Sequence, residues 1–363
     1  MNNDTTERIT TSQATFVIVN YAVAAGVLTL PRILVQIGKT PDVWISVIIG
    51  GLLSFLAGYL IIRLGRRFPG QTFYQYCSKI VGRPIALFIG LAIVVYFTCI
   101  ASYELRSVQE ITTFFLLEGT PGWTITAVIL WVAVYLCIGG INALARMCRL
   151  IVPITWVVFF GAGLLSMEMF DLENLRPVLA DGLGPVLRAV KPTALTFTAG
   201  EDLLFLVALM AKPQKAGKAF AVGTAIATFF YVTSVVISIG VFSTDGVVTR
   251  TWPFLDVVRS YEVSYLFFER FEPLMLAIWI IQIFCCICIT LYGAAIGLSH
   301  LFQLNYRYSL FALLPFVHIL KEIPHTINGL FAFGTILGDC AMLMFGIVPL
   351  VLLVIAKLRK ISA

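Results

Sequence analysis

Ten apolar segments occupy nearly the whole chain and leave only short polar stretches between them. The apolar core of a bilayer is ~30 Å thick and is crossed by ~20 residues of α-helix. The composition agrees, because charged residues make up 12% of this chain but about a quarter of an ordinary soluble domain. The sequence therefore predicts an all-α membrane protein, with ten transmembrane helices in a single domain over residues 1–363.

The segments differ in length, and polar or Pro- and Gly-bearing stretches mark where each one ends. A short amphipathic helix is also predicted at residues 71–81, on the membrane surface, with Phe73, Tyr74 and Ile80 toward lipid. The transmembrane spans are expected at about residues 15–30, 43–62, 85–103, 123–141, 150–167, 192–210, 219–242, 273–302, 309–320 and 330–355.

Basic residues are concentrated in alternate connections, and this predicts the orientation. Cytosolic loops of membrane proteins carry an excess of Lys and Arg. If the N-terminus lies in the cytosol, the cytosolic side receives Arg8, Arg63, Arg66, Arg67, Lys79, Arg83, Arg146, Arg149, Lys212, Lys215, Lys218, Arg307, Lys357, Arg359 and Lys360. Both termini are therefore predicted to be cytosolic, and the net charge of +6 reflects topology rather than nucleic-acid binding.

An interruption is predicted in the first span, at Ala24-Ala25-Gly26. Three small residues leave the backbone unshielded, and glycine lowers the cost of leaving helical geometry. Unwound backbone is tolerated in a membrane only where it is buried in protein or lines a wet cavity. Taken alone, the same residues would favour a close helix-packing contact, for which small residues are the usual choice.

A second interruption is predicted in the sixth span, where Ala199-Gly200 precedes Glu201 and Asp202. Five spans separate the two interruptions, so the second copy has the opposite membrane orientation. Interrupted helices at matching positions in two halves of opposite topology indicate an inverted-repeat transporter fold. The repeats are predicted at about residues 9–170 and 190–357.

The two interruptions together predict a ligand site near the bilayer midplane. Helix N-termini offer amides and partial positive charge to a carboxylate, and helix C-termini offer carbonyls to an ammonium group. A small zwitterionic amino acid fits this arrangement. The residues expected to offer main-chain groups are Ala24, Ala25 and Gly26 from the first span and Thr198, Ala199 and Gly200 from the sixth.

Two further spans are expected to wall this site. Tyr96 and Ile100 are four residues apart on one face of the third span, and Cys286 and Thr290 have the same spacing in the eighth. Tyr96 could instead be an aromatic core residue. The Thr290 hydroxyl could instead bond to its own helix backbone.

Glu201 is the most informative charge, because a carboxylate within a transmembrane span is costly and is a functional candidate by default. It could close a gate, bind a proton or pair with a cation. It could equally bond to the unwound backbone of a neighbouring helix. Glu104 and Arg106, near the outer end of the third span, are expected to form a surface ion network.

The stretch Ala25-Gly26-Val27-Leu28-Thr29-Leu30-Pro31-Arg32 resembles the first-helix motif of the amino acid-polyamine-organocation superfamily. Over nearly its whole length the chain is similar to the B subunit of spore-germinant receptors, the endospore germination permease family. The stretches that carry this second resemblance are residues 103–106, 174–177, 182–185 and 268–272. One departure is Ala24, where the family often has glycine.

The resemblance implies an amino-acid permease or LeuT-like fold with ten spans and interrupted first and sixth helices. It also implies a location in the spore inner membrane and assembly with an A subunit and a lipoprotein C subunit. The function it implies is sensing of a nutrient, often an L-amino acid, that triggers germination.

Two functions therefore remain open: a ligand-sensing receptor subunit, and an amino-acid or ion transporter that is proton-coupled or facilitative. The fifth span has no Lys or Arg that could replace a coupling ion, which favours a sensor. We expect no enzymatic activity, because no nucleophile, base and orienting group can be placed together. We also expect no cofactor and no metal, since the three histidines lie near span ends without Cys or carboxylates at ligand spacing.

Overall fold

The computed structural model describes residues 8–197, 200–260 and 272–359, and nearly all of them are helical. Within these ranges the only β-type pairing is an isolated bridge between Ile9 and Met210. The elements of the first half are α1 (Thr11–Ala22), α2 (Gly26–Gly38), α3 (Val43–Gly65), α4 (Phe73–Val81), α5 (Arg83–Phe115), α6 (Gly122–Ile138), α7 (Gly140–Leu165), η1 (Ser166–Met169) and η2 (Leu172–Leu175). Those of the second half are α8 (Gly184–Val190), α9 (Thr193–Thr196), α10 (Leu203–Leu209), η4 (Pro213–Lys215), α11 (Ala216–Val248), α12 (Pro253–Ser260), α13 (Glu272–Phe302), α14 (Tyr306–Glu322), α15 (Ile327–Ala341), η5 (Met342–Ile347) and α16 (Val348–Leu358).

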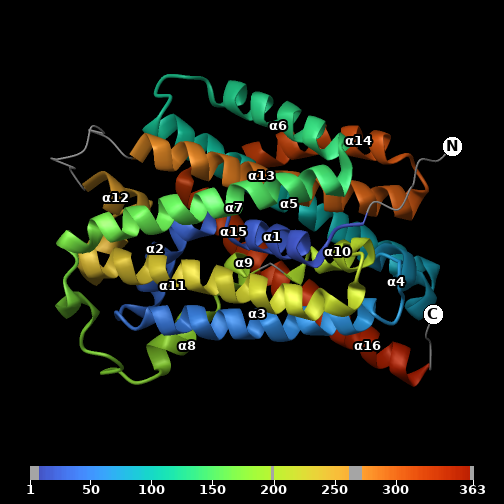
Figure 1. Ribbon diagram of the computed structural model, residues 1–363, viewed down its shortest axis with the longest axis horizontal. Helices are drawn as coiled ribbons and strands as arrows, with labels where there is room; N and C mark the ends of the chain where they lie inside the picture. The colour runs from blue at the N-terminus through green and yellow to red at the C-terminus, as the bar shows by residue number, and fades with distance from the viewer. Residues whose placement is uncertain (1–7, 198–199, 261–271, 360–363) are drawn as a thin grey trace.

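The long helices run side by side in one elongated bundle (Figure 1). Among the described residues, six helices are long and apolar enough to cross a membrane, or seven if the bent α1–α2 pair counts as one span. Side chains such as Leu52, Trp131, Tyr135 and Val157 are exposed on the outside of the bundle, where lipid would cover them. The prediction of an all-α multi-pass membrane protein is confirmed.

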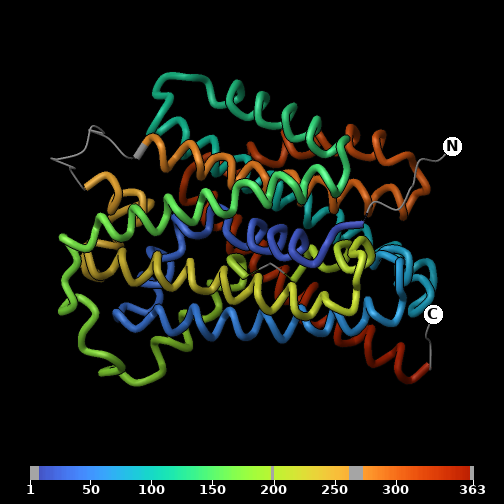
Figure 2. The backbone as a smooth tube through the Cα atoms, viewed as in Figure 1, coloured from blue at the N-terminus to red at the C-terminus, as the bar shows by residue number. Residues whose placement is uncertain are grey.

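The first interruption is present where the small residues predicted it. Thr10 and Gln13 form a capping box that starts α1. The helix ends at Ala22, and α2 starts at Gly26 with its axis bent by 49° from that of α1. The tube view shows this change of direction at the centre of the bundle (Figure 2).

The second interruption is also present. The predicted span 192–210 consists of two short helices, α9 and α10, and no α-helix continues between them: Phe197, Glu201 and Asp202 are not helical, and Gly200 has 3₁₀ geometry. Thr198 and Ala199, the other residues predicted at this interruption, lie outside the described residues. A Cβ at Gly200 would lie 3.3 Å from the Gly58 Cα of α3, a tight contact with backbone that favours glycine.

Two details of the predicted segments are wrong. Helix α7 begins at Gly140, ten residues before the predicted start, because its polar first turns extend beyond the apolar stretch. Helix α4 forms where it was predicted, but Phe73, Tyr74 and Ile80 are buried. They face protein rather than lipid because α4 packs against α5, α13 and α16.

Candidate functional site

The α1–α2 break lies at the centre of the bundle, in contact with α11 and α13. Its carbonyl groups are already hydrogen-bonded to side chains from those two helices. The bonds are Tyr231 Oη to Ala22 O (2.7 Å), Gln282 Nε2 to Val23 O (2.9 Å), Trp279 Nε1 to Ala24 O (3.1 Å) and Ser234 Oγ to Val27 O (2.7 Å). The unwound backbone is thus hydrogen-bonded within the membrane, as buried peptide groups require.

The amide side of the break has a different partner. The Ala25 N–H, at the N-terminus of α2, donates to Glu104 Oε2 over 3.3 Å, and Ala25 provides no capping side chain. Glu104 comes from α5 and is 6% exposed. A helix N-terminus carries a partial positive charge, so the Glu104 carboxylate occupies the position that favours an anion.

A small cavity of about 40 Å³, here called the central pocket, lies against the break. It is walled by the first break and its flanking helices α1 and α2, together with α5, α9, α11 and α13. Its lining residues are Tyr21, Ala22, Ala24, Gly26, Thr29, Leu30, Ile33, Ile100, Tyr103, Glu104, Pro192, Leu195, Thr196, Tyr231 and Cys286. Glu104 is the only charged member of this set.

Glu201 lines a separate cavity of about 250 Å³ and joins three elements. Its two carboxylate oxygens accept hydrogen bonds from Tyr21 Oη of α1 (2.6 Å) and Tyr96 Oη of α5 (2.5 Å). Glu201 itself is 1% exposed. Since Tyr21 also lines the central pocket, these bonds connect the pocket wall to the second break.

The structure brings some of the residues predicted for the ligand site together. Ala24, Gly26, Ile100 and Cys286 line the central pocket, and Ala25 contributes the amide that binds Glu104. The assignment of these residues to a ligand remains a prediction.

Other predicted site residues lie away from the central pocket. Tyr96 bonds to Glu201. The Thr290 hydroxyl donates to the carbonyls of Cys286 and Ile287 in its own helix. Gly200 lines a separate lateral cavity of about 250 Å³, between α3, α9 and η5.

Glu104 is the residue that sequence reasoning misplaced. It was expected in a surface ion network, but it is buried and lines the central pocket. The signal was present, because Tyr96, Ile100 and Glu104 follow each other at intervals of four and share one helix face. Arg106 lies two residues further on and faces elsewhere, since residues two apart do not share a helix face.

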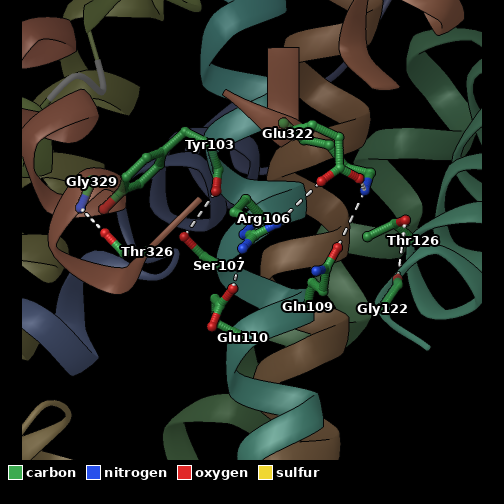
Figure 3. Close-up of polar contacts among 11 residues, drawn as sticks. Tyr103, Arg106, Ser107, Gln109, Glu110, Gly122, Thr126, Glu322, Thr326 and Gly329 are labelled. Atoms are coloured by element: carbon green, nitrogen blue, oxygen red, sulfur yellow. Dashed lines mark hydrogen bonds and ion pairs between the residues drawn. The ribbon is translucent and has the colours of Figure 1, made fainter. Parts of the chain in front are cut away.

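Arg106 does form an ion network, at the end of α5 next to α14 (Figure 3). Its guanidinium lies 2.7 Å from Glu110 Oε1 and 3.4 Å from Glu322 Oε2. The buried Lys321 ammonium donates to Glu322 and to Gln109. The bond from Lys321 lowers the pKa of Glu322, and Arg106 adds to the effect. This contribution to stability is present above the unfolded-state pKa of Glu322 and is lost as the pH falls through the lower folded-state value.

Replacing Arg106 by glutamine should lower the free energy of unfolding by about 1–2 kcal/mol, because the buried end of this network loses its central cation. Denaturant unfolding of the purified protein measures the change. Arg176→Gln is the matched control, because Arg176 pairs with Glu173 while both side chains are mostly exposed. Equal losses in the two variants would contradict a special role for the Arg106 network.

A third cavity, of about 270 Å³ and here called the outer cavity, adjoins the central pocket. The two share Ile33, Tyr103, Pro192 and Leu195. Lys191 and Asp339 line the outer cavity and form an ion pair at 3.0 Å. A ligand from this side would therefore pass Tyr103 and Leu195 before reaching Glu104.

The family model and the relatives that match this sequence are all described as spore germination proteins. A family model described as "Spore germination protein" matches residues 8–330. Spore germination protein YndE of Bacillus subtilis (strain 168) is 45% identical over 355 residues, which cover 98% of each chain. Spore germination protein A2 of the same strain is 31% identical and covers 97% of this chain and 96% of its own.

The solved structures that align with this chain have low sequence identity to it. MhsT in complex with L-phenylalanine aligns with a TM-score of 0.67 at 11% identity, over 96% of this chain and 98% of its own. A Na⁺-coupled sialic acid symporter also aligns with a TM-score of 0.67, at 13% identity, over 94% of this chain and 78% of its own. These alignments establish the LeuT-like fold predicted from the sequence.

Proposed function

This chain belongs to the spore germination protein family of multi-pass membrane proteins, and from this membership we propose that it is the nutrient-sensing subunit of a spore germinant receptor. It binds a small molecule, expected to be an L-amino acid, in the central pocket between the two breaks. Binding triggers germination. We further propose that it lies in the spore inner membrane with both termini in the cytosol, and that it assembles with an A subunit and a lipoprotein C subunit.

The observation that carries this proposal is the central pocket itself. It is bounded by the first helix break and by α9, the helix that leads into the second break, and a cavity of about 40 Å³ has room for about three water molecules. A molecule with few heavy atoms, such as glycine or alanine, matches this size. Its walls combine apolar side chains with Thr29, Thr196 and Glu104, the mixture that is typical of small-molecule sites.

Binding at this position can change the conformation of the protein because the pocket is shared by separate helices. A ligand shifts a conformational equilibrium only by its difference in affinity for the two states. The α1–α2 break, α5, α9, α11 and α13 all contribute lining residues. A ligand that contacts them all therefore favours the arrangement in which they converge.

A transporter is the second candidate, and the LeuT-like fold favours it. One set of hydrogen bonds, at the C-terminal end of α1, favours a sensor instead. The C-terminal carbonyls of a half-helix are a usual position for a coupling cation, but here Gln282 Nε2 donates to Asn20 O and Val23 O at the end of α1. Thr155 donates to the amide oxygen of Gln282 and holds it in place.

Small L-amino acids should raise the melting temperature of the purified protein, because a ligand that binds only the native state stabilises it. Proteoliposomes that contain this chain alone should show no concentrative uptake of the same labelled amino acids. Robust concentrative uptake would replace the sensor by the transporter. A melting temperature unchanged by a panel of nutrients would remove the ligand site from this subunit.

A further inference from the structure

We propose that Glu104 recognises the ammonium group of the ligand, so that the central pocket selects small primary amines and does not hold a ligand carboxylate at the N-terminus of α2. This inference rests on the proposed function and specifies the chemistry of the same site. It reverses one part of the simplest expectation for a broken helix, in which the α2 amides bind the carboxylate of an amino acid.

The position that favours an anion, at the N-terminus of α2, is already filled. The first turn of α2 is the positively polarised end of a helix of 13 residues. Glu104 Oε2 accepts the Ala25 N–H there. A ligand carboxylate placed on the same turn would lie against a second carboxylate in a medium of low dielectric constant, where repulsion between like charges is strong.

Glu104 lacks a cationic partner. No Lys or Arg lines the central pocket, and Arg106 pairs with Glu110 and Glu322 instead. The other carboxylate oxygen, Oε1, makes no hydrogen bond with any described residue. A buried carboxylate is costly unless it is paired. A ligand that brings its own positive charge supplies the missing partner.

The groups that could otherwise hold an ammonium are the carbonyls of the first break. The carbonyls of Ala22, Val23 and Ala24 already accept side-chain donors from Tyr231, Gln282 and Trp279. An ammonium bound there would have to displace those donors. Glu104 offers an oxygen atom without displacing a donor from the break, so it is the preferred acceptor.

The test compares three forms of the same small amino acids on the purified full-length protein. Glycine, alanine, serine and valine are each supplied as the free amino acid, as the carboxamide and as the N-acetyl derivative. The readout is the ligand-dependent rise in melting temperature. The carboxamide should bind within a few-fold of the free amino acid, and N-acetylation should abolish binding.

Two variants assign the effect to the residue. Glu104→Gln should weaken binding of the free amino acid at least tenfold, because it removes the charge and keeps the shape. Glu104→Asp keeps the charge, so it should retain the requirement for an amine even if binding is weaker or the glutamine variant folds poorly. Glu110→Gln is the matched control on the same helix, outside the central pocket, and should bind as the parent does.

The outcomes separate this inference from the proposed function. Stabilisation by N-acetyl forms, loss of binding for every carboxamide, or unchanged affinity in a folded Glu104→Gln variant would overturn the role of Glu104 while leaving the ligand site in place. Failure of all free amino acids and all carboxamides to stabilise the parent protein would overturn both.

Discussion

Replacing Gly26 by alanine is expected to abolish the nutrient response of spores while the protein still accumulates in the membrane. A Cβ at this position would lie 2.6 Å from Tyr231 Oη and 3.5 Å from Thr196 Oγ1. Moving the Tyr231 ring aside would disturb the hydrogen bond that its hydroxyl donates to Ala22 O. Overpacking of this kind costs about 1–3 kcal/mol of folding free energy. The added methyl group also fills part of a very small pocket and so excludes the ligand.

The dose-response of germination to nutrient, measured alongside the protein level in spore membranes, tests this prediction. Gly161→Ala is the matched control, since an added Cβ there meets no atom within 4 Å, and it should respond normally. The double variant Gly26→Ala/Tyr231→Phe removes the clashing hydroxyl and should recover part of the response. A normal dose-response in Gly26→Ala alone would move the ligand site away from the first break.

The second large effect is expected for Glu201→Gln, which should lower the free energy of unfolding by about 2–3 kcal/mol. The carboxylate accepts from Tyr21 and Tyr96 at the same time, and hydrogen bonds to a charged group contribute about 1.5–3 kcal/mol. Glutamine offers only one acceptor oxygen, so it can accept from only one of the two tyrosines. Its NH₂ group would then face the hydroxyl of the other tyrosine, which is a donor in the parent protein. Denaturant unfolding of the purified protein measures the loss.

The neighbouring acid provides the comparison that isolates this effect. Asp202 is equally buried, but its two carboxylate oxygens have no hydrogen-bond partner among the described residues. Asp202→Asn should therefore leave stability unchanged or raise it. The losses in Tyr21→Phe and Tyr96→Phe should also become small once Glu201 is glutamine, because coupled partners are not additive. Additive losses would contradict a shared hydrogen-bonded unit.

Much of the architecture could be predicted because it follows from local sequence properties. Each span is a run of apolar residues that only a helix can carry through a membrane. The break at Ala24-Ala25-Gly26 could be predicted because small residues inside such a run remove the shielding of the backbone. The errors fell at element ends, such as Gly140, and on the buried face of α4, where packing partners decide exposure.

The site could be predicted only in part. The breaks and the positions of Ile100 and Cys286 follow from helix periodicity. The donors that occupy the carbonyls of the first break come from α11 and α13, more than 200 residues away in the chain. Nothing in the local sequence of Tyr231, Trp279 or Gln282 distinguishes them from ordinary core residues.

By itself, then, the sequence determined that this chain folds as a bundle of membrane helices with two interruptions, because hydrophobicity and backbone shielding are properties of neighbouring residues. Only the tertiary structure decided how those interruptions are satisfied. It placed Glu104 at the α2 N-terminus and Glu201 between two tyrosines. The physical reason is that a buried polar group finds its partner through the packing of distant helices, which no local pattern encodes.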